Sequence, residues 1–258
     1  MDTEVDEPGA SFKFIFQEID GRKLKNQMKY SNVIPAIFLS RDNRFIAKCE
    51  IGGVPQVVHV KNTGRCRELL IPGATVYLEQ HDNPHRKTRY SLIAVQKGDR
   101  LVNIDSQAPN AVLQEALMNG VGLPGIEDEI VHIKPEAVYG GSRFDFYVET
   151  KDQGIFIEVK GVTLEKEGIA LFPDAPTQRG VKHIEALIMA AKDGYVSYVV
   201  FIVQMKGTRY VMPNDAMHAE FGIALREAEK AGVRILAYDC RVKADEIIMD
   251  EMVEVVLQ

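Results

Sequence analysis

The sequence changes its pattern near residue 108. Before this point, short strand-like runs are separated by turns rich in glycine, proline and asparagine. The runs are Phe45 to Ile51, Gln56 to Val60, Ala74 to Gln80, Tyr90 to Lys97 and Leu101 to Asp105. Five short strands within one domain predict a small β-barrel of the OB type, and such barrels commonly bind oligonucleotides. We expect this domain to span residues 29–108, after an N-terminal extension of residues 1–28.

From residue 109 to 258, expected strands alternate with expected helices, which predicts an α/β (α+β) domain with a mixed sheet. The strands are Phe144 to Glu149, Gly154 to Val162, Tyr195 to Gln204 and Val233 to Tyr238. Asn110 is expected to cap a first helix through Met118. A second helix should begin at Pro176 and run through Ala191, and a third should follow Pro213-Asn214 and end near Gly232.

Composition limits the class of protein. With 46% apolar residues the chain can bury a sizeable core. No apolar run is long enough to span a bilayer, and the acidic first ten residues lack a signal-peptide pattern, so we expect a cytoplasmic protein with no membrane partner. The three cysteines lie far apart without a CxxC pair, which predicts buried, inert thiols in place of a zinc site or disulfides.

Charge is unevenly distributed along the chain, whose net charge is −6. Residues 29–110 hold 12 Lys and Arg against 7 Asp and Glu, whereas residues 111–258 hold 15 against 24. A basic module joined to an acidic one suits a polyanion binder whose second domain holds cations. An ordinary solvated surface explains the same counts, and charge alone favours that simpler explanation.

Three charged residues follow a pattern that suits metal chemistry. Asp145 is followed thirteen residues later by Glu158, and Lys160 stands two residues beyond, with the turn Asp152-Gln153-Gly154 between the two strands. Residues two apart in a strand share a face, so Glu158 and Lys160 project together. Asp145 and Glu158 can hold Mg²⁺ or Mn²⁺, and Lys160 can then act on a phosphate, as in a metal-dependent nuclease of the PD-(D/E)xK kind. The alternative is a cross-strand ion pair on a half-exposed sheet.

Two further clusters suit phosphate binding. At the start of the second helix, Gln178 and Arg179 can meet phosphate through side chains and free backbone N–H groups, and His183 shares a helical face with Arg179. Helix capping and a structural histidine are the alternatives. In the first domain, cations and hydrogen-bond donors surround a glycine-containing turn. These are Lys61, Asn62, Thr63, Arg65 and Arg67, for which a solvated hairpin turn is the alternative.

Four strings in this order resemble the sugar fermentation stimulation protein A family over residues 29–258: HVKNTGRCRELLIPG (59–73), SRFDF (142–146), IFIEVKGVTL (155–164) and FPDAPTQRGVKHIEAL (172–187). The resemblance implies an OB-like N-terminal domain, a C-terminal domain of the PD-(D/E)xK restriction-endonuclease-like fold, and DNA binding. It gives Asp145, Glu158 and Lys160 the catalytic positions, with Glu115 as the acidic residue of the preceding helix. An exposed helical glutamate is the ordinary alternative for Glu115.

Residues Met1 to Gln27 have no counterpart in the family pattern, and Met28-Lys29-Tyr30 resembles its usual start. An accessory segment, a vector-derived piece and a mis-set start codon all remain open. For the whole chain we consider a Mg²⁺- or Mn²⁺-dependent nuclease acting on DNA, or less readily on RNA. A non-catalytic DNA-binding regulator of sugar metabolism genes and a hydrolase of a small phosphorylated metabolite are the alternatives. Formation of a homo-oligomer is compatible with each of them.

Overall fold

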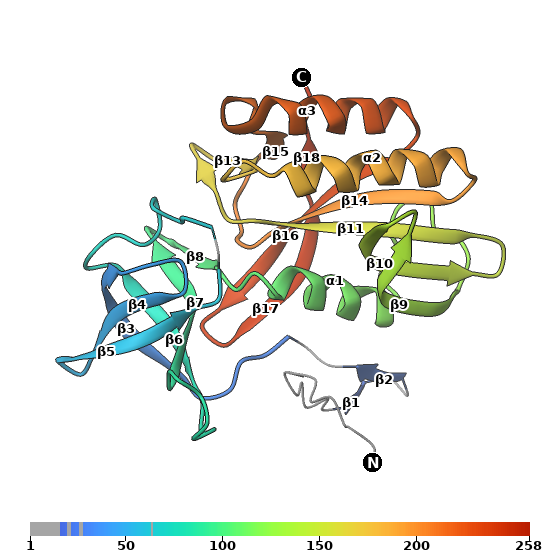
Figure 1. The fold of residues 1–258 in the computed structure, drawn as a ribbon. Helices are drawn as coiled ribbons and strands as arrows, with labels where there is room; N and C mark the ends of the chain where they lie inside the picture. Colours follow the sequence, from blue (N-terminus) through green and yellow to red (C-terminus); the bar gives the residue numbers. More distant parts are fainter. Residues whose placement is uncertain (1–15, 20–21, 26–27, 63) are drawn as a thin grey trace, which may run out of the picture.

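Two sheets from separate parts of the chain organise the molecule (Figure 1). The computed structural model describes residues 16–19, 22–25, 28–62 and 64–258. A short hairpin of β1 (Phe16–Ile19) and β2 (Arg22–Lys25) comes first, and a β-barrel and a helix-covered mixed sheet follow. The prediction of an OB-like domain followed by a mixed-sheet domain is confirmed.

The strands of the barrel pair in the order β5-β4-β3-β6-β7, and a parallel pairing between β5 and β7 closes the ring. Its strands are β3 (Val33–Arg41), β4 (Ile46–Ile51), β5 (Val54–Val60), β6 (Thr75–Gln80) and β7 (Tyr90–Lys97). The sequence analysis did not predict β3, which contains Pro35, a residue that is uncommon inside a paired strand. The expected fifth strand is β8 (Arg100–Asn103), which pairs with β7 outside the closed ring.

The larger sheet has the strand order β17-β16-β14-β11-β10-β9. Its centre is parallel and its two sides are antiparallel. The strands are β9 (Ile130–Tyr139), β10 (Ser142–Thr150), β11 (Gly154–Val162), β14 (Val196–Val203), β16 (Arg234–Lys243) and β17 (Glu246–Met252). Strand β11 lies between β10 and β14 and is mostly buried, as its apolar run predicts.

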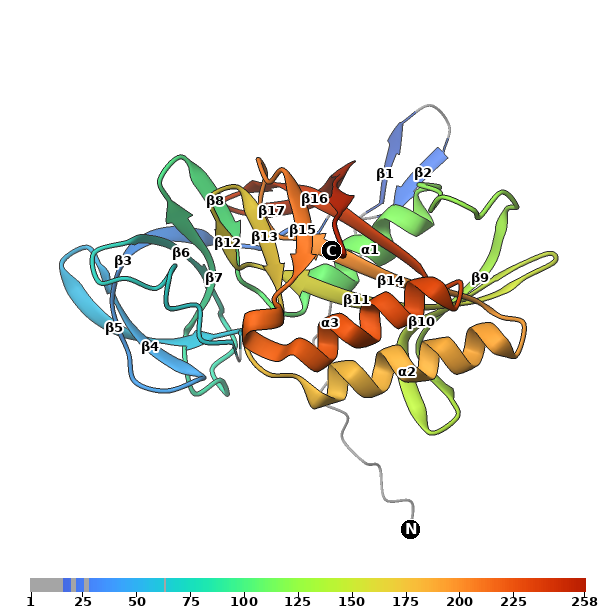
Figure 2. The same ribbon diagram turned by 90° about the horizontal axis from the view of Figure 1, so that it is seen from above.

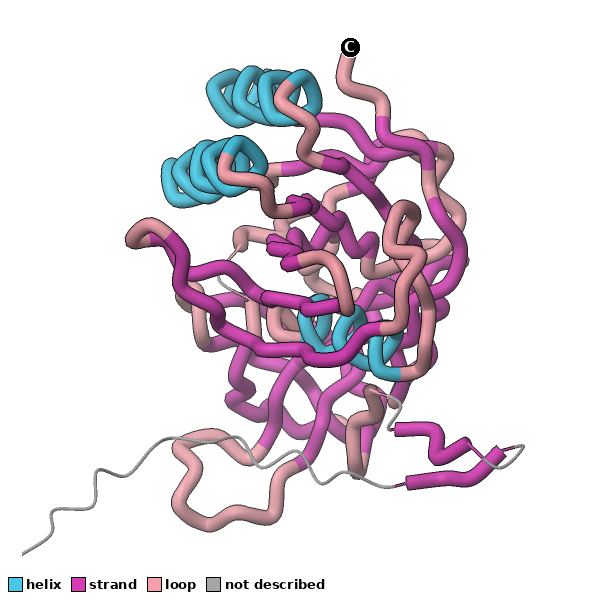
Figure 3. The backbone as a smooth tube through the Cα atoms, turned by 90° about the vertical axis from the view of Figure 1, so that its right-hand side faces the viewer, coloured by secondary structure: helices cyan, strands magenta, loops and turns pink. Residues whose placement is uncertain are grey.

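Helices cover both faces of this sheet (Figures 2 and 3). Helix α1 (Ala108–Met118) lies on one face, and α2 (Gln178–Lys192) and α3 (Asp215–Lys230) lie together on the other. The Thr177 hydroxyl caps α2 by accepting a hydrogen bond from the Gly180 N–H at 3.0 Å, so the helix begins two residues later than predicted. Asn110 was wrongly predicted to cap α1. The helix begins at Ala108, with Pro109 in its first turn, which leaves the Asn110 side chain available for another partner.

The C-terminal domain also has a four-stranded sheet beside its six-stranded one, with the strand order β12-β13-β15-β18. Its strands are β12 (Glu165–Lys166), β13 (Ile169–Phe172), β15 (Tyr210–Pro213) and β18 (Glu254–Val255). The sequence analysis did not predict this sheet, because its strands have only two to four residues and pair with distant parts of the chain.

Contacts between the domains hold the barrel at the carboxyl end of β11. Glu165, the first residue of β12 and three residues after the end of β11, forms ion pairs with Lys97 at 2.7 Å and with Arg100 at 3.1 Å, both from the β7–β8 hairpin. The Gln204 amide nitrogen, directly after β14, donates to the backbone and side-chain oxygens of Asn103. These side chains connect the two domains through buried or half-buried polar groups.

The thiols behave as predicted, since Cys49, Cys66 and Cys240 are all buried and free. Burial raises the pKa of the Cys49 thiol to about 12, so this thiol is a poor nucleophile. Within the part of the chain that the structure describes, none of the helices has the length and apolar character needed to cross a membrane.

Candidate active site

Asp145 lies where strands β10 and β11 stop pairing. The register runs from Glu149 opposite Gly154 to Phe146 opposite Ile157, one residue short of Asp145. There the carboxylate accepts a hydrogen bond from the Val159 N–H at 2.7 Å and another from the Asn110 side-chain amide at 2.9 Å. Asp145 is therefore fixed between a strand and the first turn of α1.

Glu158 is a buried carboxylate with two very different oxygens. Its side chain is 3% exposed. One oxygen, Oε1, lies 2.5 Å from the Lys160 ammonium and 2.5 Å from Nδ1 of His183. The other, Oε2, is buried and has no hydrogen-bond partner among the described residues. An unpaired buried carboxylate oxygen is unfavourable unless a cation or a donor reaches it, so Oε2 is suited to be a metal ligand.

The two carboxylates influence each other's protonation. Burial raises the pKa of Asp145, and the nearby negative charge of Glu158 raises it further, against the hydrogen bonds from Val159 and Asn110. Burial alone would also raise the pKa of Glu158, but the hydrogen bond from His183 and the charge of Lys160 outweigh it and hold this pKa below its usual range. Two close carboxylates with a cationic neighbour form an oxygen-rich site that suits a hard divalent cation.

His183 orients Glu158 from α2. The Arg179 guanidinium, which can only donate, gives a hydrogen bond to Nε2 of His183 at 3.3 Å. Nε2 therefore acts as the acceptor, and Nδ1 carries the proton that is donated to Glu158. The structure thus gives His183 an internal partner, while Arg179 lies exposed at the start of the helix. The Gln178 amide nitrogen lies 3.1 Å from Nε2 of His218, and Gln178 is also exposed.

Glu115 has a different environment from the one that the family pattern suggested. Its carboxylate accepts a hydrogen bond from the Met28 N–H at 2.7 Å. Burial raises its pKa to about 7, and the charge of Glu246 adds to this effect, against the hydrogen bond from Met28. Glu115 stands five residues after Asn110, about 140° around the helix. The α1 side chain that reaches Asp145 is therefore Asn110, which the sequence analysis considered only as a cap.

In the barrel loop, residues 61–67, some polar side chains already have partners within the protein and others are exposed. Lys61 forms ion pairs with Glu79 at 3.4 Å and with Asp105 at 3.1 Å. The Asn62 side chain donates to the Ile104 carbonyl at 2.9 Å and accepts a hydrogen bond from the Gly64 N–H. Lys61 and Asn62 therefore hold the loop in place, whereas Thr63 lies outside the described residues.

Arg65 and Arg67 are the exposed cations of this loop. Arg41 organises the same loop from β3 by donating to the backbone carbonyls of Asn62, Gly64 and Arg65 at 2.6 to 2.8 Å. The sequence analysis missed this role, because an arginine that binds carbonyls more than twenty residues away leaves no local pattern. Arg41 uses its own charge within the loop and leaves Arg65 and Arg67 accessible to a ligand.

Comparison with known proteins identifies the family. Residues 107–246 match the model of the sugar fermentation stimulation protein RE domain, and residues 39–104 match that of the SfsA N-terminal OB domain. The chain belongs to the sugar fermentation stimulation protein family. The resemblance stated from the sequence is thereby confirmed.

Individual relatives of the family cover nearly the same span. A sugar fermentation stimulation protein homolog of Desulfitobacterium hafniense (strain DSM 10664 / DCB-2) is 56% identical over 230 residues, which cover 89% of this chain and 99% of the relative. A homolog of Clostridium beijerinckii is 54% identical, covering 89% of this chain and all of the relative. The solved structure of Pyrococcus furiosus SfsA in complex with Ca²⁺ matches with a TM-score of 0.81 and 30% identity, covering 90% of this chain and 99% of that one.

A second acidic group lies far from Asp145 in the sequence. Asp239, Asp250 and Glu251 bring ligand atoms within 4.8 Å of one another. The Lys206 ammonium already binds all three carboxylates, at 2.9, 2.6 and 2.9 Å respectively. A cation at this cluster would have to displace the ammonium, whereas Oε2 of Glu158 needs no such displacement.

Proposed function

We propose that this protein binds DNA and hydrolyses phosphodiester bonds with a divalent cation, Mg²⁺ or Mn²⁺, held by Asp145 and Glu158. The observation that carries the proposal is the buried Oε2 of Glu158, which has no partner among the described residues, on a side chain whose charge raises the pKa of the neighbouring Asp145. Such a donor set suits hard cations. The Pyrococcus furiosus SfsA structure was solved in complex with Ca²⁺, a cation of the same class, which supports this choice of ligand chemistry.

The surrounding side chains suit hydrolysis of a phosphodiester. A bound divalent cation supplies an acidified water and neutralises charge on the phosphate. Asn110 and Val159 orient Asp145, while His183 orients Glu158. Lys160 projects from the same face of β11 as Glu158, and its ammonium can stabilise the negative charge that develops on the phosphate oxygens.

Two exposed segments beside this site are proposed to bind the DNA backbone. Arg65 and Arg67 belong to the barrel loop, and Gln178 and Arg179 to the start of α2. The segments are neighbours, because a Cβ atom added at Gly64 would contact the carboxylate of Asp174, which lies a few residues before α2. Together they provide cations and a helix N-terminus from two domains, which suits a phosphate backbone that crosses the domain boundary.

The test is turnover of DNA. Wild-type protein is incubated with supercoiled, linear and branched DNA in the presence of Mg²⁺, Mn²⁺ or EDTA, and cleavage is expected only with a metal. Lys160→Ala should lower the rate by ~10²-fold or more, because one charge aimed at the transition state is lost. Its metal binding and DNA affinity should change little, since Lys160 is one cation among many contacts. Lys166→Ala, an exposed lysine of β12, is the matched control and should cut normally.

A non-catalytic regulator that binds DNA near sugar metabolism genes is the second candidate. It is favoured by one observation: Lys160 and His183 already satisfy Oε1 of Glu158, so this oxygen needs no metal ion as a partner. In that case removal of Lys160 would chiefly lower the free energy of unfolding, by up to ~3–5 kcal/mol for a buried ion pair. The loss would be smaller than this because His183 still donates a hydrogen bond to Glu158. A wild-type protein that binds these DNA substrates and never cuts them would select the regulator.

A further inference from the structure

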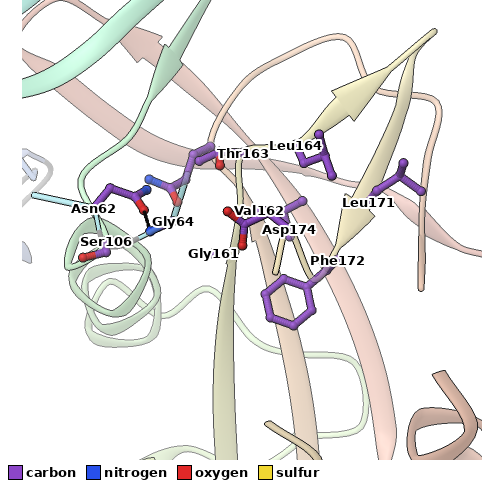
Figure 4. Close-up of a pocket in the computed structure, with 11 residues that line it drawn as sticks. Asn62, Gly64, Ser106, Gly161, Val162, Thr163, Leu164, Leu171, Phe172 and Asp174 are labelled. Carbon is purple, nitrogen blue, oxygen red and sulfur yellow. Dashed lines mark hydrogen bonds between the residues drawn. The ribbon is translucent and has the colours of Figure 1, made fainter. Parts of the chain in front are cut away.

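A cavity of about 160 Å³ lies between the barrel and the C-terminal domain (Figure 4). The barrel side contributes Asn62, and the segment before α1 contributes Ser106. The C-terminal domain contributes Gly161 and Val162 of β11 and three polar side chains, Thr163, Asp174 and Gln204. Gly161 directly follows Lys160 along β11, so the cavity lies against the strand that carries Glu158 and Lys160.

The described residues of the cavity wall offer hydrogen-bond acceptors and no cation. The Gln204 amide nitrogen is engaged by the oxygens of Asn103 and Asp105, which fixes the orientation of the amide. Its oxygen therefore faces β11, where a Cβ atom added at Gly161 would lie only 2.7 Å away. Asp174 also lines the cavity, where its carboxylate accepts hydrogen bonds from its own and the Ala175 backbone N–H groups and lies near the charge of Arg41. Among the described residues that line the cavity there is no lysine or arginine, and the Asp174 carboxylate forms part of the wall, so a phosphate group is a poor fit inside it.

The size of the cavity selects a small group. Its volume of about 160 Å³ corresponds to roughly five water molecules, or on the order of ten non-hydrogen atoms, and is below the 300–1,000 Å³ typical of drug-sized ligands. A base pair or a duplex is too large to enter. Val162 and Phe172 add apolar surface to the polar wall. A compact heterocycle that carries N–H donors fits this combination of size, apolar surface and acceptors.

The position of the cavity connects this heterocycle to the phosphate site. Gly161 is three residues from Glu158, or about 10 Å along an extended strand. A nucleobase in the cavity can therefore keep its own backbone phosphate near Lys160.

We propose that the cavity binds one unpaired nucleobase with an exocyclic amine, as in adenine, cytosine or guanine, while the adjoining phosphate lies at Asp145 and Glu158. This inference rests on the proposed function and narrows its substrate class. The substrate is DNA with an unpaired nucleotide, such as an overhang or a branch, in place of an uninterrupted duplex. The amine donates to Asp174 or to the Gln204 oxygen. Thymine has two carbonyls, no exocyclic amine and a single N–H donor, at N3 between the carbonyls, so it pairs less well with these acceptors.

Binding can be measured without metal and without cleavage. The probes are fluorescent duplexes that differ in one overhanging nucleotide, which is adenine, thymine or abasic, together with a fully paired duplex, all titrated in EDTA by anisotropy. Wild-type protein should bind the adenine overhang about tenfold more tightly than the abasic one, with thymine between them. Asp174→Asn should reduce the preference for adenine over thymine to less than about twofold, because an acceptor oxygen becomes a donor.

Two further variants separate recognition from folding and from general affinity. Ser106→Trp, at the exposed rim of the cavity, should reduce the adenine-over-abasic preference by filling the space, without changing a charge. Asp152→Asn, in the exposed turn between β10 and β11, is the charge-matched control and should bind all probes as wild type does. Affinity for the fully paired duplex should be the same for every variant.

The outcomes distinguish this inference from the proposed function. Equal wild-type affinity for the adenine and abasic overhangs, with duplex binding intact, overturns the base-binding cavity alone. An Asp174→Asn or Ser106→Trp variant that keeps the full wild-type preference overturns it as well. Absence of binding to every DNA probe overturns the proposed function and the cavity together.

Discussion

Metal binding at Asp145 and Glu158 can be measured as a gain in stability. A cation that binds only the folded protein at a concentration of 100 Kd adds about 2.7 kcal/mol to the free energy of unfolding. For a domain of this size, each kcal/mol shifts Tm by about 2–4 °C. We therefore expect Mn²⁺ or Mg²⁺ to raise Tm by about 5–10 °C relative to EDTA. The binding site is ready to accept the cation, because Oε2 of Glu158 has no partner among the described residues that must first be displaced.

The perturbation replaces both carboxylates by amides of the same shape, Asp145→Asn with Glu158→Gln. An amide oxygen can still accept the hydrogen bond that Val159 gives to residue 145, so much of the local geometry is kept. The negative charge is lost, and with it the attraction for a divalent cation. We expect the metal-induced increase in Tm to fall to nearly zero in this variant, while Tm in EDTA reports any folding defect separately.

Calorimetric scans of the same proteins with Mn²⁺, Mg²⁺, Ca²⁺ and EDTA provide the assay. The control is Asp250→Asn with Glu251→Gln, which alters the acidic group bound by Lys206 and leaves the candidate site intact. This control should keep the full metal response. If the response survives in the first variant and disappears in the control, the metal site has been assigned to the wrong carboxylates and the proposed chemistry loses its basis.

Two further predictions concern salt and pH. DNA affinity should fall with salt by roughly 0.9 log units per phosphate contact per log unit of salt. Replacing Arg65 and Arg67 with Gln should lower this slope, measured in anisotropy titrations, by the equivalent of about one to two contacts. An unaltered slope would mean that DNA binds elsewhere on the protein. The pKa of Glu115 is raised from 4.5 to about 7 in the folded protein. Between pH 4.5 and 7 the Glu115 carboxyl is therefore protonated in the folded protein and ionised in the unfolded chain. The contribution of this proton to the free energy of unfolding is complete below pH 4.5 and is lost as pH rises through 7. Glu115→Gln should therefore be more stable than wild type by ~1 kcal/mol above pH 7, a value discounted for the half-exposed side chain, and equal to it in acid. Urea unfolding at both pH values measures this, and a pH-independent difference would contradict it.

Much of the C-terminal fold was predictable because its signals are local. Strand β11 has the predicted bounds, Gly154 to Val162, since its long apolar run is bounded by turn residues and tolerates two charges. The hairpin that joins it to β10 follows from the intervening turn. Glu158 and Lys160 project together as expected, because alternation along a strand requires only the sequence.

The unpredicted parts depend on contacts between distant residues. Strand β3 contains Pro35 and is stabilised by pairing on both sides, which overrides its weak local preference. Strand β9 is mostly exposed and carries no clear alternation. For the site, Asn110 was predicted only as a helix cap, and the family resemblance gave Glu115 as the acidic site residue of the first helix. Only the rotation of α1 against β11 decides which of the two faces Asp145.

The boundary between the domains links the barrel to the chemistry of β11. Gln204 donates to Asn103 in the barrel with its amide nitrogen, and its oxygen lines the cavity next to Gly161. The same side chain therefore fixes the position of the barrel and forms part of the cavity wall. A rotation of the barrel would change the cavity while the hydrogen bonds of Asp145, which come from α1 and β11, stayed in place. Recognition of an unpaired base and binding of the cation thus depend on different contacts, which is why the two can be tested by separate substitutions.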